Sequence, residues 1–224
     1  MDAIKFNSEA YPDSRCGQDD SRVQAILPLV GRVGRVLDVG CLDGTIGELF
    51  LKSGNDVYGL DASEPAVAKA VQCGIKAQLG NVEQRFPFED DYFDAVFAGE
   101  IIEHIFDVDM MLSEIFRVLK PGGHFVVTTP NLAALGRRLM LLLNINPHIE
   151  ISFTGNAAGH IRYFVKNTFY EILEKHGFKV EVFRSDVVNF NASGSLKSLA
   201  LARVFPTLGK SLIVKAVKPE TILG

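Results

Sequence analysis

Hydrophobic and polar positions follow two alternating patterns along the chain from residue 35 onward. Short β-rich runs predict strands, and between them lie segments whose apolar residues recur at helical spacing. The predicted strands are 35–39, 56–60, 75–79, 93–98, 124–129, 179–187 and 211–217. The predicted helices are 45–52, 63–74, 109–119 and 168–176. This order predicts an α/β fold in which a parallel sheet is covered by helices on both faces.

Two connections stand out against this regular pattern. Lys120-Pro121-Gly122-Gly123 has proline and glycine where a type II turn needs them, so a turn is predicted before strand 124–129. The next connection, 131–165, greatly exceeds the usual length of about 4–6 residues, which predicts a cap over a functional site. Within it, residues 132–143 predict a helix. The favoured interpretation buries its leucines, and the alternative is weak contact with a membrane surface through Arg137-Arg138.

The composition of the chain favours a single cytoplasmic domain and disfavours nucleic-acid-binding and membrane-spanning proteins. The 224 residues are 47% hydrophobic and 22% charged, which suits one domain over 1–224 with an unassigned N-terminal segment at 1–20. The net charge of −4 disfavours a nucleic-acid partner. Three cysteines without metal-type spacing favour a reducing compartment. The first residues lack an apolar signal core and no apolar run approaches about 20 residues, so we expect a cytoplasmic protein without a transmembrane segment.

A glycine-rich turn follows the first predicted strand, in the sequence VLDVGCLDGTIG from Val36 to Gly47. Gly40 and Gly44 would let a ligand approach the backbone N–H groups at the start of the next helix. Asp61, about 20 residues further along, can accept hydrogen bonds from ribose hydroxyls. Because Leu42 replaces the second glycine of the dinucleotide fingerprint, the pattern disfavours NAD and predicts an adenosine site.

Four segments in this order resemble the motifs of class I S-adenosylmethionine-dependent methyltransferases: VLDVGCLDGTIGELF, VYGLDAS, GNVEQRFPFEDDYFDAVFAGEIIEHI and RVLKPGGHFVVTTPN. The resemblance covers residues 35–218. It implies a doubly wound, Rossmann-like three-layer sandwich. In that fold the seven-stranded sheet is mostly parallel, the last strand is antiparallel, and the methyl donor lies across the strand ends.

The resemblance also implies which residues contact S-adenosylmethionine. Asp38 and the turn residues Gly40, Cys41 and Gly44 would face its methionine part. The ribose would lie at Asp61 and Ala62, the adenine at Asn81 and Val82, and Glu100 would touch the donor. The sequence departs from the family pattern at Leu42, usually glycine, and at Asn81, usually aspartate. The donor has no phosphates and asparagine still accepts hydrogen bonds, so we expect the site to persist.

An acidic cluster with a histidine follows strand 93–98, at Glu100, Glu103 and His104. If a helix begins here, the three side chains share one face beyond the carboxyl end of a strand. One interpretation makes His104 the general base that removes a hydroxyl proton, with the two glutamates assisting. A second binds a divalent ion such as Mg²⁺, because E-x-x-E-H resembles the motif of quinone-biosynthesis O-methyltransferases and small-RNA 3′-end 2′-O-methyltransferases, with His160 as a further ligand. A third leaves Glu103 and His104 purely structural.

These observations together predict an enzyme that transfers a methyl group from S-adenosylmethionine to a small-molecule acceptor, at a hydroxyl oxygen. RNA 3′-end 2′-O-methylation is the alternative within enzymes. A non-catalytic S-adenosylmethionine-binding module is the alternative outside them.

Overall fold

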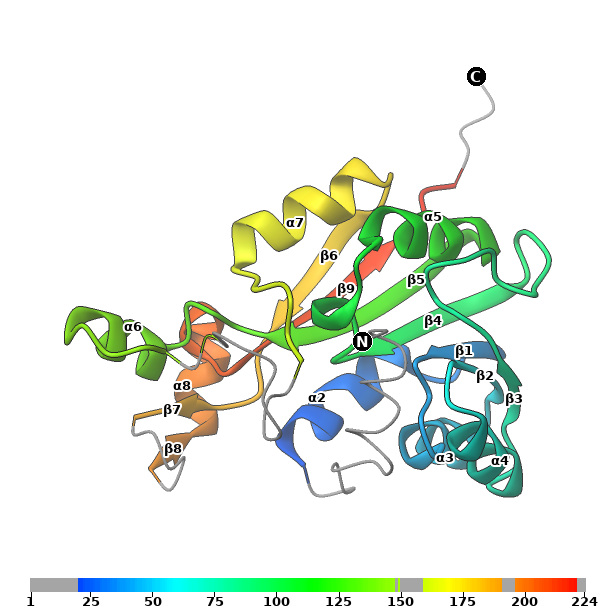
Figure 1. Ribbon diagram of the computed structural model, residues 1–224, viewed down its shortest axis with the longest axis horizontal. Helices are drawn as coiled ribbons and strands as arrows, with labels where there is room; N and C mark the ends of the chain where they lie inside the picture. Colours follow the sequence, from blue (N-terminus) through cyan, green and yellow to red (C-terminus); the bar gives the residue numbers. More distant parts are fainter. Residues whose placement is uncertain (1–19, 148, 150–158, 191–195, 221–224) are drawn as a thin grey trace.

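A seven-stranded sheet forms the centre of the computed structural model, which describes residues 20–147, 149, 159–190 and 196–220 (Figure 1). The strand order is β3-β2-β1-β4-β5-β9-β6. The bounds are β1 Arg35–Val39, β2 Asp56–Asp61, β3 Lys76–Leu79, β4 Phe93–Gly99, β5 Leu119–Pro130, β6 Lys179–Arg184 and β9 Ser211–Val217. β9 is antiparallel to β5 and to β6, whereas the strands from β3 to β5 pair in parallel. The predicted sheet with its antiparallel last strand is confirmed.

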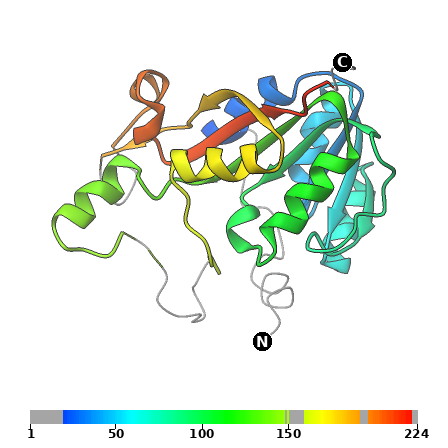
Figure 2. The same ribbon diagram turned by 90° about the horizontal axis from the view of Figure 1, so that it is seen from above.

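Helices cover both faces of the sheet, as Figures 1 and 2 show together. One face carries α2 (Ser21–Val30), α3 (Thr45–Lys52) and α4 (Glu64–Gln72), and the other carries α5 (Val108–Val118) and α7 (Lys166–Lys175). Successive strand residues point to opposite faces. Along β4, Ala95 and Phe97 join the core beneath the first group of helices, while Val96 and Ala98 join the core beneath the second. The predicted three-layer sandwich is therefore confirmed.

Helix α2 precedes the first strand and was not among the predicted elements. Asp20 caps it by accepting a 2.7 Å hydrogen bond from the Arg22 backbone N–H. Its buried residues are Val23, Ile26, Leu29 and Val30, a helical repeat that the sequence already contains. The helix brings the side chain of Arg22 to the carboxyl edge of the sheet, where it forms an ion pair with Glu100. The rest of the N-terminal segment, including Cys16, lies outside the described residues.

The predicted turn at 120–123 lies inside β5 instead of before it. Leu119 pairs with Phe93, and the next pair along β5 joins His124 to Ala95, so the intervening residues form a bulge. Gly122 has a φ of +76°, the left-handed conformation that the sequence pattern requires of its glycine. The left-handed glycine of the predicted turn is confirmed. Because β5 pairs with β4 on both sides of the bulge, residues 120–123 belong to the strand.

The chain after β6 departs most from the sequence pattern. β6 ends at Arg184, three residues earlier than predicted, because Ser185 and Asp186 turn to bond Ser211. The Ser185 hydroxyl donates to the Ser211 carbonyl at 2.6 Å, and the Ser211 N–H donates to Asp186 Oδ1 at 3.0 Å. Short elements follow, none of them predicted: β7 (Val188–Asn189), β8 (Lys197–Ser198), α8 (Leu199–Val204) and η2 (Pro206–Leu208).

The long connection after β5 begins and returns at one place, where Asn131 bridges Phe164 in parallel and the Leu132 N–H donates to the Phe164 carbonyl. It contains α6 (Leu135–Leu142), so the helix predicted within 132–143 is present but shorter. The favoured interpretation of this helix was wrong, since α6 has no buried residue. Residues 148 and 150–158 of the predicted cap lie outside the described part of the chain. Within the described residues, no helix has the length and hydrophobicity that a membrane crossing requires.

Candidate functional site

The turn after β1 is built from backbone conformations that are rare for side-chain-bearing residues. Gly40 and Gly44 have φ values of +74° and +83°. A Cβ on Gly40 would lie 2.4 Å from Ile101 Cδ1, and one on Gly44 would lie 2.9 Å from the Cα of Ala70. Both glycines are therefore needed, for conformation and for the close approach of the neighbouring segments. Most backbone N–H groups of the turn have partners, since those of Gly40 and Cys41 donate to the Leu60 carbonyl and that of Gly44 donates to the Cys41 carbonyl.

Leu42 adopts a glycine-like conformation although it carries a side chain. Its φ of +46° lies in the left-handed region, where a leucine is strained by roughly 1–2 kcal/mol. Its N–H donates a 2.9 Å hydrogen bond to Asp61 Oδ2 at the end of β2. The residue at which this sequence departs from the family pattern therefore has the left-handed backbone that a glycine adopts readily.

Two buried carboxylates lie beneath this turn. Asp61 is 8% exposed and also accepts a 2.9 Å hydrogen bond from the Ser63 N–H, while burial raises its pKa. Asp38 is 2% exposed, and its Oδ2 has no hydrogen-bond partner within the described residues. Burial, and then the charge of Asp61, raise the pKa of Asp38 to about 8. S-adenosylmethionine would fit these residues, because its positive charge would offset the buried carboxyl group of Asp38 and its ribose hydroxyls could donate to Asp61.

The two residues predicted at the adenine follow β3. Asn81 Oδ1 accepts a 2.8 Å hydrogen bond from the Glu83 N–H, which closes a local turn. Val82 is buried within the core beneath α5. A carbonyl oxygen has a second lone pair, so Asn81 can still accept from an adenine amino group. Its role at the donor stays a prediction, as do those of Cys41 and Ala62.

Glu100 does not share a helical face with Glu103 and His104, contrary to the expectation from their spacing. It has a φ of +54°, its N–H donates to the Thr128 carbonyl at 3.0 Å, and the short helix η1 (Ile102–His104) begins only two residues later. Its carboxylate forms an ion pair of 2.7 Å with Arg22 Nη1 and accepts a 2.9 Å hydrogen bond from Thr128 Oγ1. Burial raises the pKa of Glu100, and Arg22 opposes that rise.

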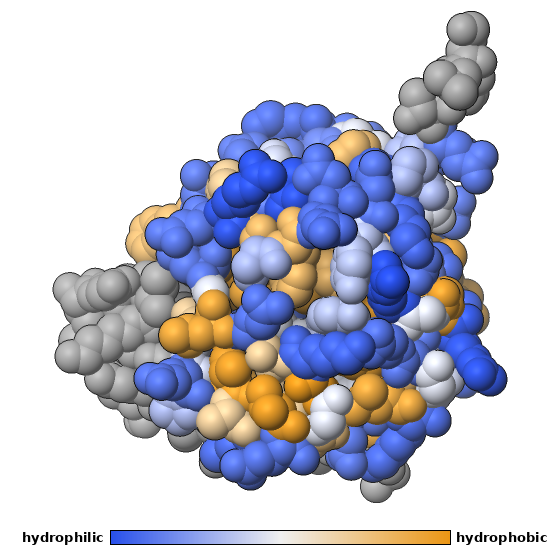
Figure 3. Space-filling view, turned by 90° about the vertical axis from the view of Figure 1, so that its right-hand side faces the viewer, coloured by the Kyte–Doolittle hydropathy of each residue, from blue (hydrophilic) through white to orange (hydrophobic). Residues whose placement is uncertain are grey.

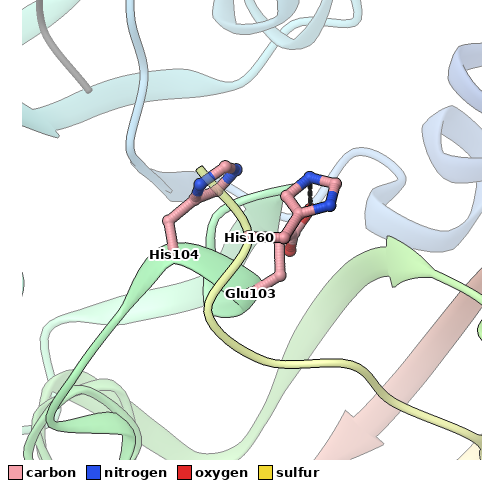
Figure 4. Close-up of side chains that lie close together, drawn as sticks. All are labelled: Glu103, His104 and His160. Carbon is pink, nitrogen blue, oxygen red and sulfur yellow. Dashed lines mark ion pairs between the residues drawn. The ribbon is translucent and has the colours of Figure 1, made fainter. Parts of the chain in front are cut away.

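Glu103 and His104 instead meet His160, which comes from the far end of the long connection (Figure 4). One ligand atom from each of the three side chains lies within 4.8 Å of the others. Glu103 is 1% exposed, and its Oε2 accepts a 3.0 Å hydrogen bond from Thr129 Oγ1. Its Oε1 lies 3.9 Å from His160 Nε2 and accepts no hydrogen bond within the described residues. The cluster therefore contains an acceptor that lacks a donor.

The charge state of this cluster follows from its burial. Burial, and then the charge of Glu100, raise the pKa of Glu103 well above its usual value. Burial, and then the neighbouring His160, lower the pKa of His104 to about 4. The His104 ring, whose Nδ1 lies 3.2 Å from the Gly159 carbonyl oxygen, is therefore neutral near pH 7. The cluster offers one carboxyl oxygen and two imidazole nitrogens as atoms that could hold a proton or a cation.

Three residues at this site were missed in the sequence. Arg22 and Thr128 hold Glu100, and Thr129 holds Glu103. For the threonines a signal existed, since both are polar residues at the carboxyl end of a strand, where ligands of open α/β sheets lie. For Arg22 the only signal was the helical repeat of α2.

The family comparison agrees with this geometry. Residues 37–127 match the family model described as "Methyltransferase domain", and this range contains the turn, Asp61 and the Glu100–His104 segment. These residues form a methyltransferase domain. The resemblance to class I S-adenosylmethionine-dependent methyltransferases is thereby confirmed at the level of the family.

Curated relatives extend the match beyond this domain. A probable S-adenosylmethionine-dependent methyltransferase of Mycolicibacterium smegmatis is 35% identical over 150 residues, which are 65% of this chain and 52% of that protein. A ubiquinone biosynthesis O-methyltransferase of Rhodopseudomonas palustris is 36% identical over 125 residues, 53% of this chain and 48% of that protein. The chain thus spans about half the length of these relatives.

A solved structure supports the fold of the methyltransferase domain. The S-adenosylmethionine-dependent methyltransferase of Thermotoga maritima, described as a possible histamine N-methyltransferase, superposes with a TM-score of 0.65 and 19% identity. The match covers 88% of each chain. At this identity the likeness concerns the fold, and it extends the class I architecture to most of the chain.

Proposed function

We propose that this protein transfers a methyl group from S-adenosylmethionine to a hydroxyl oxygen of a small-molecule acceptor. The observation that carries the proposal is Glu103 Oε1, a buried acceptor that has no donor among the described residues and lies beside two imidazoles. Ile101, between Glu100 and η1, lies against Gly40 of that turn. A hydroxyl presented here would find both a methyl donor and a group that can take its proton. The name of the Rhodopseudomonas palustris relative supports oxygen as the atom methylated.

In this proposal some residues bind the methyl donor and others take part in proton transfer. Asp61 holds the ribose, and the Gly40–Gly44 turn and the carboxyl group of Asp38 face the charged methionine part. S-adenosylmethionine supplies an electrophilic methyl group on its sulfonium. As the acceptor oxygen forms its bond to that carbon and the carbon–sulfur bond breaks, His104 receives the hydroxyl proton. Arg22 and Thr128 keep Glu100 oriented at the edge of the site.

The lowered pKa of His104 makes it a weak base at neutral pH, because general bases work best when their pKa lies near the operating pH. A divalent ion held by Glu103, His104 and His160 would supply positive charge that lowers the pKa of the acceptor hydroxyl. Two of these three side chains offer nitrogen, whereas Mg²⁺ prefers oxygen ligands. The set therefore suits a first-row transition ion or zinc better than the Mg²⁺ expected from the sequence.

The experiment measures S-adenosylhomocysteine formed from S-adenosylmethionine by the purified full chain, with a water-soluble catechol as the acceptor probe. We expect turnover in the wild type and a loss of roughly 100-fold in kcat for His104→Ala, with unchanged S-adenosylhomocysteine affinity. His176→Ala, at the end of α7, is the matched control. Equal turnover in wild type and His104→Ala would refute the assignment of His104.

The same assay separates proton transfer to His104 alone from activation by an ion. Chelator treatment, followed by Zn²⁺, Mn²⁺ or Mg²⁺, should abolish and then restore turnover if the three side chains hold an ion. Turnover that survives chelation assigns the step to His104. An RNA oligonucleotide tested as acceptor addresses 3′-end methylation, whose phosphate contacts would make activity fall steeply with salt.

A further inference from the structure

A group of short elements projects from one end of the sheet and forms a lobe. It consists of α6, β7, β8 and α8, which both ribbon views place at the end of the molecule away from β3 (Figures 1 and 2). β7 contacts both helices. The Arg138 guanidinium of α6 also donates to the Thr207 carbonyl in η2, at 3.4 Å. We refer to α6, β7, β8 and α8, with their flanking residues, as the apolar lobe.

Large hydrophobic side chains are concentrated on the surface of this lobe. Of the fourteen that are exposed among the described residues, ten belong to it. Five follow α6 and its C-terminal turn: Leu139, Leu141, Leu142, Leu143 and Ile145. Five lie around β7 and α8: Phe190, Leu196, Leu199, Val204 and Phe205. Soluble proteins do not commonly leave apolar residues gathered in this way, so the lobe has the surface of an interaction site.

The charge of the lobe differs from that of the whole chain. The segments 131–149 and 187–210 contain five of the 23 basic residues and none of the 27 acidic residues. The five are Arg137, Arg138, Lys197, Arg203 and Lys210. All of them except Arg137 are exposed. A protein with a net charge of −4 therefore carries a locally basic end, in which apolar and cationic side chains are interspersed.

We propose that the apolar lobe docks on the surface of an anionic phospholipid bilayer. Leucines and phenylalanines would enter the boundary between headgroups and acyl chains, while arginine and lysine side chains reach the lipid phosphates. With eight residues, α6 is far too short to span a bilayer, so it lies in the plane of the interface. A two-fold contact between copies of the lobe would bring identical basic surfaces together, which like-charge repulsion opposes. The lobe thus matches an anionic surface better than a second copy of itself.

The opposite end of the molecule provides an internal comparison. Figure 3 shows the side that carries β3 and α4, where hydrophilic residues are interspersed with separate hydrophobic groups. Val71 of α4 is 51% exposed, and Lys52 of α3 has a side chain that is 55% exposed. Both residues are exposed and lie in helices, as Leu142 and Arg203 of the lobe do, and Leu142 is the more exposed of the two apolar residues at 81%. Among the described residues, exposed apolar and basic side chains gather together in the lobe, so we expect lipid to bind there.

The test measures sedimentation of the full chain with vesicles of phosphatidylcholine alone and of phosphatidylcholine mixed with phosphatidylglycerol. We expect binding to the anionic vesicles, weakened at high salt because screening shortens the range of charge attraction. Leu142→Ser should weaken the partition coefficient by roughly tenfold. Arg203→Gln should weaken it by roughly fivefold. The matched controls Val71→Ser and Lys52→Gln should leave it unchanged, and thermal unfolding checks that all four variants fold.

Several outcomes would overturn the proposal. One is the absence of binding to anionic vesicles at low salt, and another is equal binding to neutral and anionic vesicles. A third is a concentration-dependent dimer in size-exclusion chromatography that Leu142→Ser dissolves, since the lobe would then be covered by a second copy. Vesicle binding is measured without any methyl acceptor, so it stands or falls independently of the proposed reaction.

Discussion

The backbone N–H of Leu42 donates a 2.9 Å hydrogen bond to Asp61 Oδ2, joining the turn after β1 to the end of β2. This bond ties the unusual residue of the turn to the carboxylate that we assign to the ribose. The left-handed conformation of Leu42 is strained, and the hydrogen bond to Asp61 stabilises it.

Glycine should be more stabilising than alanine at position 42. A Cβ at a φ of +46° is strained, and glycine removes the strain while keeping the N–H that Asp61 accepts. We expect Leu42→Gly to exceed Leu42→Ala in unfolding free energy by about 1 kcal/mol, measured by urea denaturation. A more stable alanine variant would show that the turn does not hold this conformation in solution.

Asp61→Asn should weaken binding of S-adenosylhomocysteine by roughly tenfold or more, because a charged acceptor for two ribose hydroxyls is lost. Titration calorimetry measures the affinity. Asp56→Asn is the matched control, since Asp56 starts the same strand with a side chain that is 43% exposed. If both variants bind as the wild type does, the ribose is not held at β2.

The stability of the protein should fall as pH rises from about 4 to about 8, in part because of Asp38. Its pKa of about 8 in the folded state lies above the ordinary aspartate value of 3.8. Between these values the folded protein keeps a proton that the unfolded chain releases, so raising the pH favours unfolding. Asp38→Asn should flatten this decline in urea midpoints relative to wild type, whereas Asp56→Asn should not. An unchanged slope in Asp38→Asn would contradict the raised pKa.

Arg22→Gln should destabilise the protein by about 1–2 kcal/mol, because it leaves the partly buried carboxylate of Glu100 without its counter-ion. The two side chains are 20% and 25% exposed, which limits the loss. Lys52→Gln breaks an exposed ion pair with Glu48 and should cost about 0.5 kcal/mol or less. Chemical denaturation of both variants provides the comparison, and equal losses would mean that Arg22 does not hold Glu100.

Local features of the chain could be predicted because they depend on residues that are close together in the sequence. The period of apolar residues specified the strands of the sheet, and the glycines at 40, 44 and 122 specified backbone conformations that the structure contains. The glycine turn and Asp61 were predicted to cooperate, and they are joined by a hydrogen bond. The shared helical face predicted for Glu100, Glu103 and His104 was wrong. That prediction required a continuous helix, and the left-handed backbone at Glu100 interrupts it.

The order of the elements, the layered α/β architecture and the turn chemistry at the strand ends can all be predicted from the amino-acid sequence. The pairing of Arg22 with Glu100, the approach of His160 to Glu103 and the exposure of most leucines of α6 become visible only in the folded chain. The physical reason is the range of the interactions. Hydrophobic period and backbone propensity act over a few residues, whereas partners distant in the sequence meet only after the layers have packed around the sheet.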